Sequence, residues 1–151
     1  MKKIALVLLG CMILGSCAHG DKGKNNLELK VDKVEPLCPS AKHTVEDWSA
    51  YNELYRNIQT ISNTNALNSL GLMPDMAMNV EAMSMQIPSD LKDDEVEEKI
   101  QKIDSEVMDF YQHVDNTELR ERVVQRHLNE ILEAFDDLNK ALNEVAQRQH
   151  T

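Results

Sequence analysis

Methionine is the residue type whose clustering could support chemistry. Five methionines fall within residues 73–85 and form two Met-x-Met pairs: Met73, Met76, Met78, Met83 and Met85. Thioether sulfur is a soft ligand that selects Cu(I). The segment therefore raises the hypothesis of a Met-rich protein that binds Cu(I) or Ag(I), with Met73, Met76 and Met83 as candidate ligands.

Helix geometry limits this metal hypothesis. Residues two apart on a helix point about 200° apart, so neither Met-x-Met pair can grip one ion, and Met76 and Met83 lie ~10.5 Å apart along the axis. Met73 and Met76 form the pair with a workable spacing. With Val80 and Ile87, Met76 and Met83 repeat by four, three and four, which is typical of core positions where methionine is an adaptable filler. The pattern favours core packing over metal binding.

The histidines and carboxylates do not form a recognisable catalytic motif. His113 and His127 each precede an apolar stripe residue, which predicts that both lie on a partly exposed helix flank. The sequence has no Glu-x-x-His, no His-Glu-x-x-His and no glycine-rich phosphate loop. An acidic cluster falls at an expected helix start, where the helix dipole favours carboxylates. Its members are Asp90, Asp93, Asp94, Glu95, Glu97 and Glu98. We therefore expect no cofactor and a protein that is not an enzyme.

Two apolar stripes predict the helices that must carry the fold. Their members are spaced alternately by four and three residues, the period of one helix face. The first stripe is Val96, Ile100, Ile103, Val107, Phe110 and Val114, and the second is Val124, Leu128, Ile131, Phe135, Leu138, Leu142 and Val145. Asn116 or Thr117 can cap the second helix after a break so short that the pair must run antiparallel. Knobs-into-holes packing would bury their seam.

Shorter helices precede this pair. Thr44 and Asp47 resemble a capping box, followed by an aromatic stripe made of Trp48, Tyr51, Tyr55 and Ile58. Pro74 suits the first turn of the Met-rich helix. Pro88 ends that helix, and Ser89 or Asp90 is expected to cap the next one. The sequence predicts an all-α fold over 44–151, a small up-down antiparallel bundle of three to four helices. Heptad seams also pair between chains, so a homodimer is left open.

The residues before the bundle are expected to form an extended tether. Residues 17–43 contain two glycines, and Pro36 and Pro39 are expected to exclude helix. Leu27, Leu29 and Val31 alternate with polar residues, as in a short strand or an extended arm.

The start of the chain has the order of a secretory signal. A basic Met1-Lys2-Lys3 precedes an apolar run of eleven residues, 4–14, and small residues then lead to Cys17. A membrane-spanning helix needs about 20 apolar residues, so this run is too short to be a permanent anchor.

The end of this segment, Leu14-Gly15-Ser16-Cys17, resembles the lipobox of bacterial lipoproteins. The resemblance implies removal of the signal peptide 1–16 and modification of Cys17 by a diacylglycerol thioether and an N-acyl chain such as palmitate. Because Ala18 and not aspartate follows, it also implies an outer-membrane address. The alternative is an ordinary secretory signal cleaved near Ser16, which would release a soluble protein.

The net charge and the cysteine content limit which kinds of molecule the protein is expected to bind. The chain carries 16 basic and 26 acidic side chains, and loss of Lys2 and Lys3 with the signal takes the net charge from −10 to −12. An acidic surface is repelled by nucleic acid, so we expect no nucleic-acid partner. Cys38 would be the remaining thiol, either free or in an intermolecular disulfide. We expect a membrane-anchored envelope protein that binds a protein partner through a helix face, such as the methionine-rich one.

Overall fold

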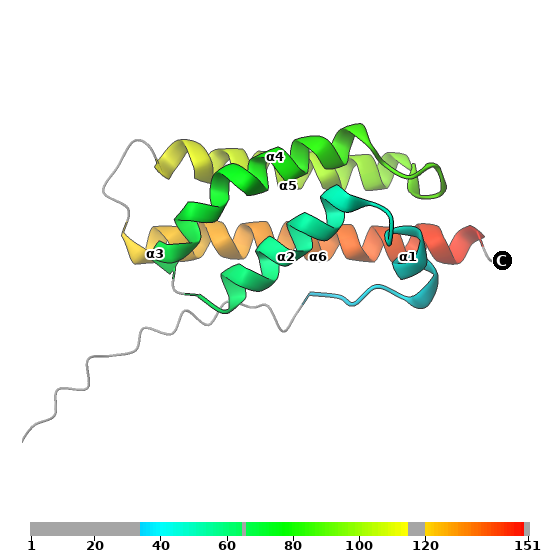
Figure 1. The fold of residues 1–151 in the computed structure, drawn as a ribbon, viewed down its shortest axis with the longest axis horizontal. Coiled ribbons are helices and arrows are strands. Elements are labelled where there is room, and N and C mark those ends of the chain that lie inside the picture. The colour runs from blue at the N-terminus through cyan, green and yellow to red at the C-terminus, as the bar shows by residue number, and fades with distance from the viewer. Residues whose placement is uncertain (1–33, 65, 115–119, 150–151) are drawn as a thin grey trace, which may run out of the picture.

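The computed structural model describes residues 34–64, 66–114 and 120–149, most of which are helical. The elements, in chain order, are α1 (Pro39–Thr44), α2 (Ser49–Ser62), α3 (Ala66–Ser69), the 3-10 turn η2 (Leu70–Leu72), α4 (Met73–Met85), the 3-10 turn η3 (Ser89–Leu91), α5 (Asp94–Val114) and α6 (Glu121–Gln149). In this described part of the chain, the long helices α2, α4, α5 and α6 alternate in direction (Figure 1). The predicted all-α, up-down bundle is therefore confirmed.

Helices α5 and α6 form the hairpin at the centre of the bundle. The predicted seam residues of both helices are buried, except Val114 at the end of α5, which is half-buried. Phe110 and Phe135 are fully buried within this seam. At an exposed edge of the hairpin, Lys102 Nζ lies 3.0 Å from Asp137 Oδ2. Within the described ranges, no helix has the length and apolar character needed to cross a membrane.

Helix α4 lies along α5 and against α2. Pro74 stands in its first turn, as predicted, where a missing N–H costs nothing. Met76, Val80 and Met83 face the core and are fully buried. The helix ends at Met85, so Ile87 follows it as a half-buried residue of the next loop.

The predicted capping box at the start of α2 is wrong. The helix begins at Ser49 with Trp48 as its N-cap residue, and no side chain caps it. Thr44 belongs instead to α1, where its Oγ1 donates to the carbonyl of Ser40 at 3.2 Å. Trp48 is buried, with 3% of its surface exposed, and this packing places the helix start after Asp47.

The predicted tether extends too far into the chain. Pro39 does not exclude helix, because it occupies the first turn of α1, where proline is well tolerated. Ala41 in the middle of α1 is fully buried. Residues 34–43 therefore pack on the bundle, and the rest of the predicted tether, 17–33, lies outside the described residues.

The predicted caps of α5 are also wrong. Ser89 and Asp90 lie in η3, and Leu91, fully buried, holds this turn against the bundle before α5 begins. Asp93 is the residue that caps: its Oδ1 accepts the N–H of Glu95 at 3.0 Å. Its Oδ2 lies 3.0 Å from Arg148 at the far end of α6. The predicted cap at Asn116 or Thr117 lies outside the described residues.

We expect Phe135→Asp to unfold the bundle, because it places a charge where the exposed fraction of the side chain is zero. The loss should exceed about 4 kcal/mol of unfolding free energy, since a buried charge without a partner adds to the lost packing. Thermal unfolding followed by circular dichroism measures it. Phe135→Leu is the matched control and should lose only about 1 kcal/mol. A Phe135→Asp protein that melts like the unaltered chain would refute the seam.

Candidate functional site

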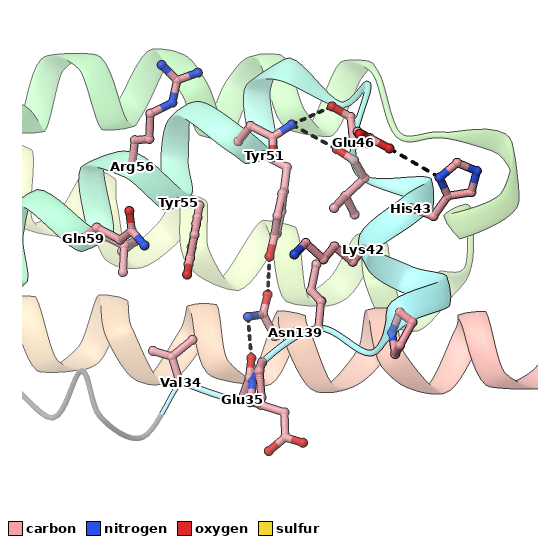
Figure 2. Close-up of a pocket in the computed structure, with 16 residues that line it drawn as sticks. Val34, Glu35, Lys42, His43, Glu46, Tyr51, Tyr55, Arg56, Gln59 and Asn139 are labelled. Atoms are coloured by element: carbon pink, nitrogen blue, oxygen red, sulfur yellow. Dashed lines mark hydrogen bonds and ion pairs between the residues drawn. The ribbon is translucent and has the colours of Figure 1, made fainter.

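A groove of about 1020 Å³ lies between α2 and the first described residues of the chain. One wall is an extended arm, residues 34–38, followed by α1. The other wall is α2, and Asn139 of α6 lies between them (Figure 2). The lining residues that the argument below uses are Val34, Glu35, Leu37, Tyr51, Tyr55 and Asn139. This volume suits a ligand of drug size or a short peptide.

Stacked aromatic rings form the apolar part of the groove. Tyr51 and Tyr55 of α2 are almost parallel, with centroids 6.5 Å apart. Both stack on Phe135 of α6, at 5.6 and 6.1 Å. Tyr51 is buried, whereas Tyr55 has 40% of its surface exposed. Tyr55 therefore offers an aromatic face to anything that enters the groove.

The hydroxyl of Tyr51 links three parts of the fold. It donates to Asn139 Oδ1 at 2.8 Å, and Asn139 Nδ2 donates to the carbonyl of Glu35 at 2.7 Å (Figure 2). Burial and, to a lesser degree, the neighbouring Tyr55 raise the pKa of Tyr51 well above its usual range, against the opposing effect of Asn139. The phenol is therefore neutral and acts as a donor at any physiological pH.

Three polar side chains of α6 hold the arm. Asp136 Oδ1 accepts the N–H of Glu35 at 2.6 Å, and Asn139 binds the carbonyl of the same residue. Asn143 makes two bonds: Nδ2 donates to the Pro36 carbonyl at 3.0 Å, and Oδ1 accepts the N–H of Cys38 at 2.7 Å. We call Asp136, Asn139 and Asn143 the amide clamp. Their spacing of three and four residues places them on one stripe of α6 beside the seam.

The charges around the groove balance. Its lining contains two bases, Lys42 and Arg56, and two acids, Glu35 and Glu46. His43 lies against Glu46, with Nδ1 3.4 Å from Oε2. Because the whole chain has a net charge of −10, this lining is less acidic than the rest of the molecule. The groove therefore repels an acidic ligand less than the rest of the molecule does.

Cys38 ends the arm and is a free, half-buried thiol. Its Sγ lies 3.2 Å from Ser40 Oγ. Burial acts against ionisation, but hydrogen bonds from the Ser40 side chain and from nearby backbone groups outweigh it and lower the pKa of the Cys38 thiol. The two alternatives for Cys38, a free thiol and an intermolecular disulfide, both stay predictions, because the structure contains one chain.

The candidate metal ligands lie inside the core. Met73, Met76 and Met83 each have no exposed surface. Met78 and Met85, with 64% and 72% exposed, lie on the opposite side of α4, one heptad apart. An ion could reach the three buried sulfurs only by opening the bundle, so their arrangement favours core packing. Among the described residues, no group of three His, Cys, Asp or Glu side chains is placed to hold a metal ion. Cys17 lies outside the described residues.

The prediction that His127 lies on an exposed flank is wrong. Its exposed fraction is 5%, and its ring stacks on Phe110 with centroids 5.0 Å apart. His113 is exposed, as predicted, and its ring lies 5.1 Å from that of His127. The position of His127 directly before the seam residue Leu128 did not reveal that it is buried, because other elements cover α6 on more than one side. Fourteen of its residues are buried.

The contacts of His127 define its neutral form. Arg126 Nη2 lies 3.4 Å from Nε2 and can only donate, so Nε2 accepts. Glu130 Oε2 lies 3.3 Å from Nδ1, but in an orientation that leaves Nδ1 without a hydrogen bond. Burial lowers the pKa of His127, and Arg126 and His113 add to this effect, while Glu130 and Asp109 oppose it.

Sequence reasoning missed the two asparagines of α6 that hold the arm beside the groove. Asn139 and Asn143 are almost fully buried, at 2% and 8% exposed, and each follows a seam leucine. An asparagine next to a core stripe in a helix interior is a signal that could have marked them, because asparagine is a weak helix former and needs a partner when buried. The sequence had also placed no function on Tyr51 beyond core packing.

Comparisons with known proteins found no match for this chain. No family model matches the chain, and neither a curated protein nor a solved structure does.

We expect the stability of the bundle to fall in mild acid because of His127. Since its pKa is lower in the folded chain than in the unfolded one, the unfolded state binds the proton more readily. Its contribution is therefore complete above pH ~6.5 and is lost as the pH falls from there toward the folded pKa. Denaturant unfolding between pH 5 and 8 measures it, with His127→Phe as the control. Parallel curves for the two proteins would contradict this account.

We also expect Asn139 to couple α2 to the arm. Asn139→Ala leaves both the Tyr51 hydroxyl and the Glu35 carbonyl without their partner, at a cost of about 2–4 kcal/mol, whereas Tyr51→Phe should cost about 1 kcal/mol. The double variant should lose less than the sum of the two single losses. Urea unfolding of the unaltered protein, the two single variants and the double variant tests this. If the losses of unfolding free energy are strictly additive, Tyr51 and Asn139 are not energetically coupled.

Proposed function

We propose that the protein is a non-catalytic, lipid-anchored envelope protein that binds an extended segment of a partner protein in the groove between the arm and α2. The observation that carries this proposal is the groove itself, which adjoins the residue where the described chain begins.

The lining supports a peptide ligand. Tyr55 presents a partly exposed ring over a buried aromatic stack, which is a typical anchor for one apolar side chain of a partner. Polar groups stand around it, among them Gln59, Arg56 and Lys42. A few polar groups around an apolar floor fix the orientation of a ligand and provide its specificity.

The anchor would hold the groove close to the membrane. Sixteen residues, 18–33, separate Cys17 from the arm. A flexible chain of that length spans about 22 Å on average. This is shorter than the full tether expected from the sequence, because the arm and α1 pack on the bundle. A partner in the same membrane, or close to it, would be within reach.

The anchoring part of the proposal predicts that Cys17→Ser abolishes membrane association. Two or more acyl chains hold a protein stably, and without them no other apolar anchor is expected to remain after the signal is processed. Fractionation of envelopes measures this. A variant that still pellets with the membranes, or a native N-terminal peptide that carries no acyl mass, would refute lipid anchoring.

The groove part predicts that Tyr55→Arg removes the partner while the bundle stays folded. Tyr55 is exposed enough that a long polar side chain can be accommodated. An affinity pull-down from solubilised envelopes, compared with the unaltered protein, should lose the retained partner at least tenfold.

Two exposed positions provide the controls for this pull-down. Leu67→Arg on α3 and Met78→Arg on α4 change apolar side chains that lie outside the groove lining, at 55% and 64% exposed. Both should retain the partner. Loss in Met78→Arg with retention in Tyr55→Arg would move the docking surface to the methionine side of α4 and refute the groove.

A further inference from the structure

The arm and α1 are attached to the bundle differently from the long helices. The arm is held mainly by the four hydrogen bonds of the amide clamp, and Ala41 is the fully buried residue of α1. Val34 and Leu37 are only partly buried against the core. The seam residues of α5 and α6, in contrast, are buried, except Val114 at the end of α5.

This difference sets the order in which the parts can open. Segments with few buried apolar contacts open at lower free energy than the packed core, as separate cooperative units. Each hydrogen bond of the clamp can be exchanged for one with water at a small net cost. The arm and α1 can therefore leave α6 while α2, α4, α5 and α6 stay folded.

We propose that residues 34–44 form a releasable strap, which forms one wall of the groove when it is clamped on α6 and lengthens the membrane tether when it is released. The strap supplies one wall of the groove, including Val34, Glu35 and Leu37, so release removes the binding site. The two states therefore couple binding to distance from the membrane.

The gain in reach follows from the lengths. Release adds eleven residues to the sixteen of the tether, giving 27 residues between Cys17 and the loop before α2. The average span rises from about 22 to about 29 Å, and the extended limit rises from about 55 to about 95 Å. A pull along the tether reaches the arm at Val34, next to the Glu35 bonds of the clamp. The effect on the tether rests on the proposed lipid anchor, whereas the release itself does not.

Cys38 is a built-in probe of the release. In the clamped state its N–H binds Asn143 and its thiol is half-buried. The Cys38 thiolate adds to one carbon of the maleimide double bond and forms a thioether. The other carbon of that double bond takes up a proton from water. Because the half-buried thiol can also react in the clamped state, release of the strap is reported by the change in rate between variants that differ in the clamp. Peptide mapping by mass spectrometry places the adduct on Cys38 in the full mature protein, whatever the state of Cys17.

Asn143→Ala removes two of the four clamp bonds and should raise the rate of Cys38 labelling about tenfold. Glu144→Ala changes the exposed neighbour on α6 and is the matched control, which should label like the unaltered protein. The helical signal in circular dichroism should keep its melting temperature within a few degrees in both variants.

Two results would overturn the strap. The first is an unchanged labelling rate in Asn143→Ala. The second is a rate that rises only in proportion to global unfolding. If Cys38 labelling changes as expected but the protein is not acylated, the strap is supported and the lipid anchor is refuted. Failure of the strap and failure of the anchor are therefore distinguishable.

Discussion

The apolar seam between α5 and α6 determines which side of α6 faces inward, and the remaining structure depends on that orientation. Long charged helices gain most of their stability from such packing and little from propensity. Once the seam positions are buried, the stripe next to them contains Asp136, Asn139 and Asn143. These side chains then point toward the arm and hold it by four hydrogen bonds, so the groove depends on the seam as well.

The seam could be predicted from the sequence because it is a repeating, local pattern. Alternation by four and three identifies one helix face without any knowledge of distant residues. The up-down order follows from the short connection between two such faces. The same reasoning failed for His127, because a residue beside the stripe becomes buried when further elements cover α6, and periodicity within one helix does not contain that information. It also failed at the helix starts. Buried Trp48 precedes α2 without any capping side chain, and buried Leu91 holds η3 in place so that Asp93, and not Ser89 or Asp90, caps α5.

The groove could not be predicted, because its contacts join residues about a hundred positions apart. The clamp bonds link Glu35, Pro36 and Cys38 to α6 across separations of 101 to 107 residues. A proline-containing stretch before the first long helix is compatible with a free tether or with a packed arm. Which of the two forms depends on the residues elsewhere in the chain that the stretch contacts. Here the arm is held by one aspartate and two asparagines of α6, and the role of these side chains appears only when the seam has fixed their direction.

Side-chain amides are well suited to hold an arm against a helix. The interior of a helix has no free backbone N–H or C=O groups, so it cannot pair with an extended chain as a strand would. An asparagine supplies both a donor and an acceptor, and Asn143 uses both on the extended arm, at the Pro36 carbonyl and the Cys38 N–H. Such bonds fix position well but add little net stability, because water offers the same bonds to the separated groups. The molecule therefore divides its tasks: the seam keeps the fold, and the clamp positions the arm, so the groove can change without loss of the bundle.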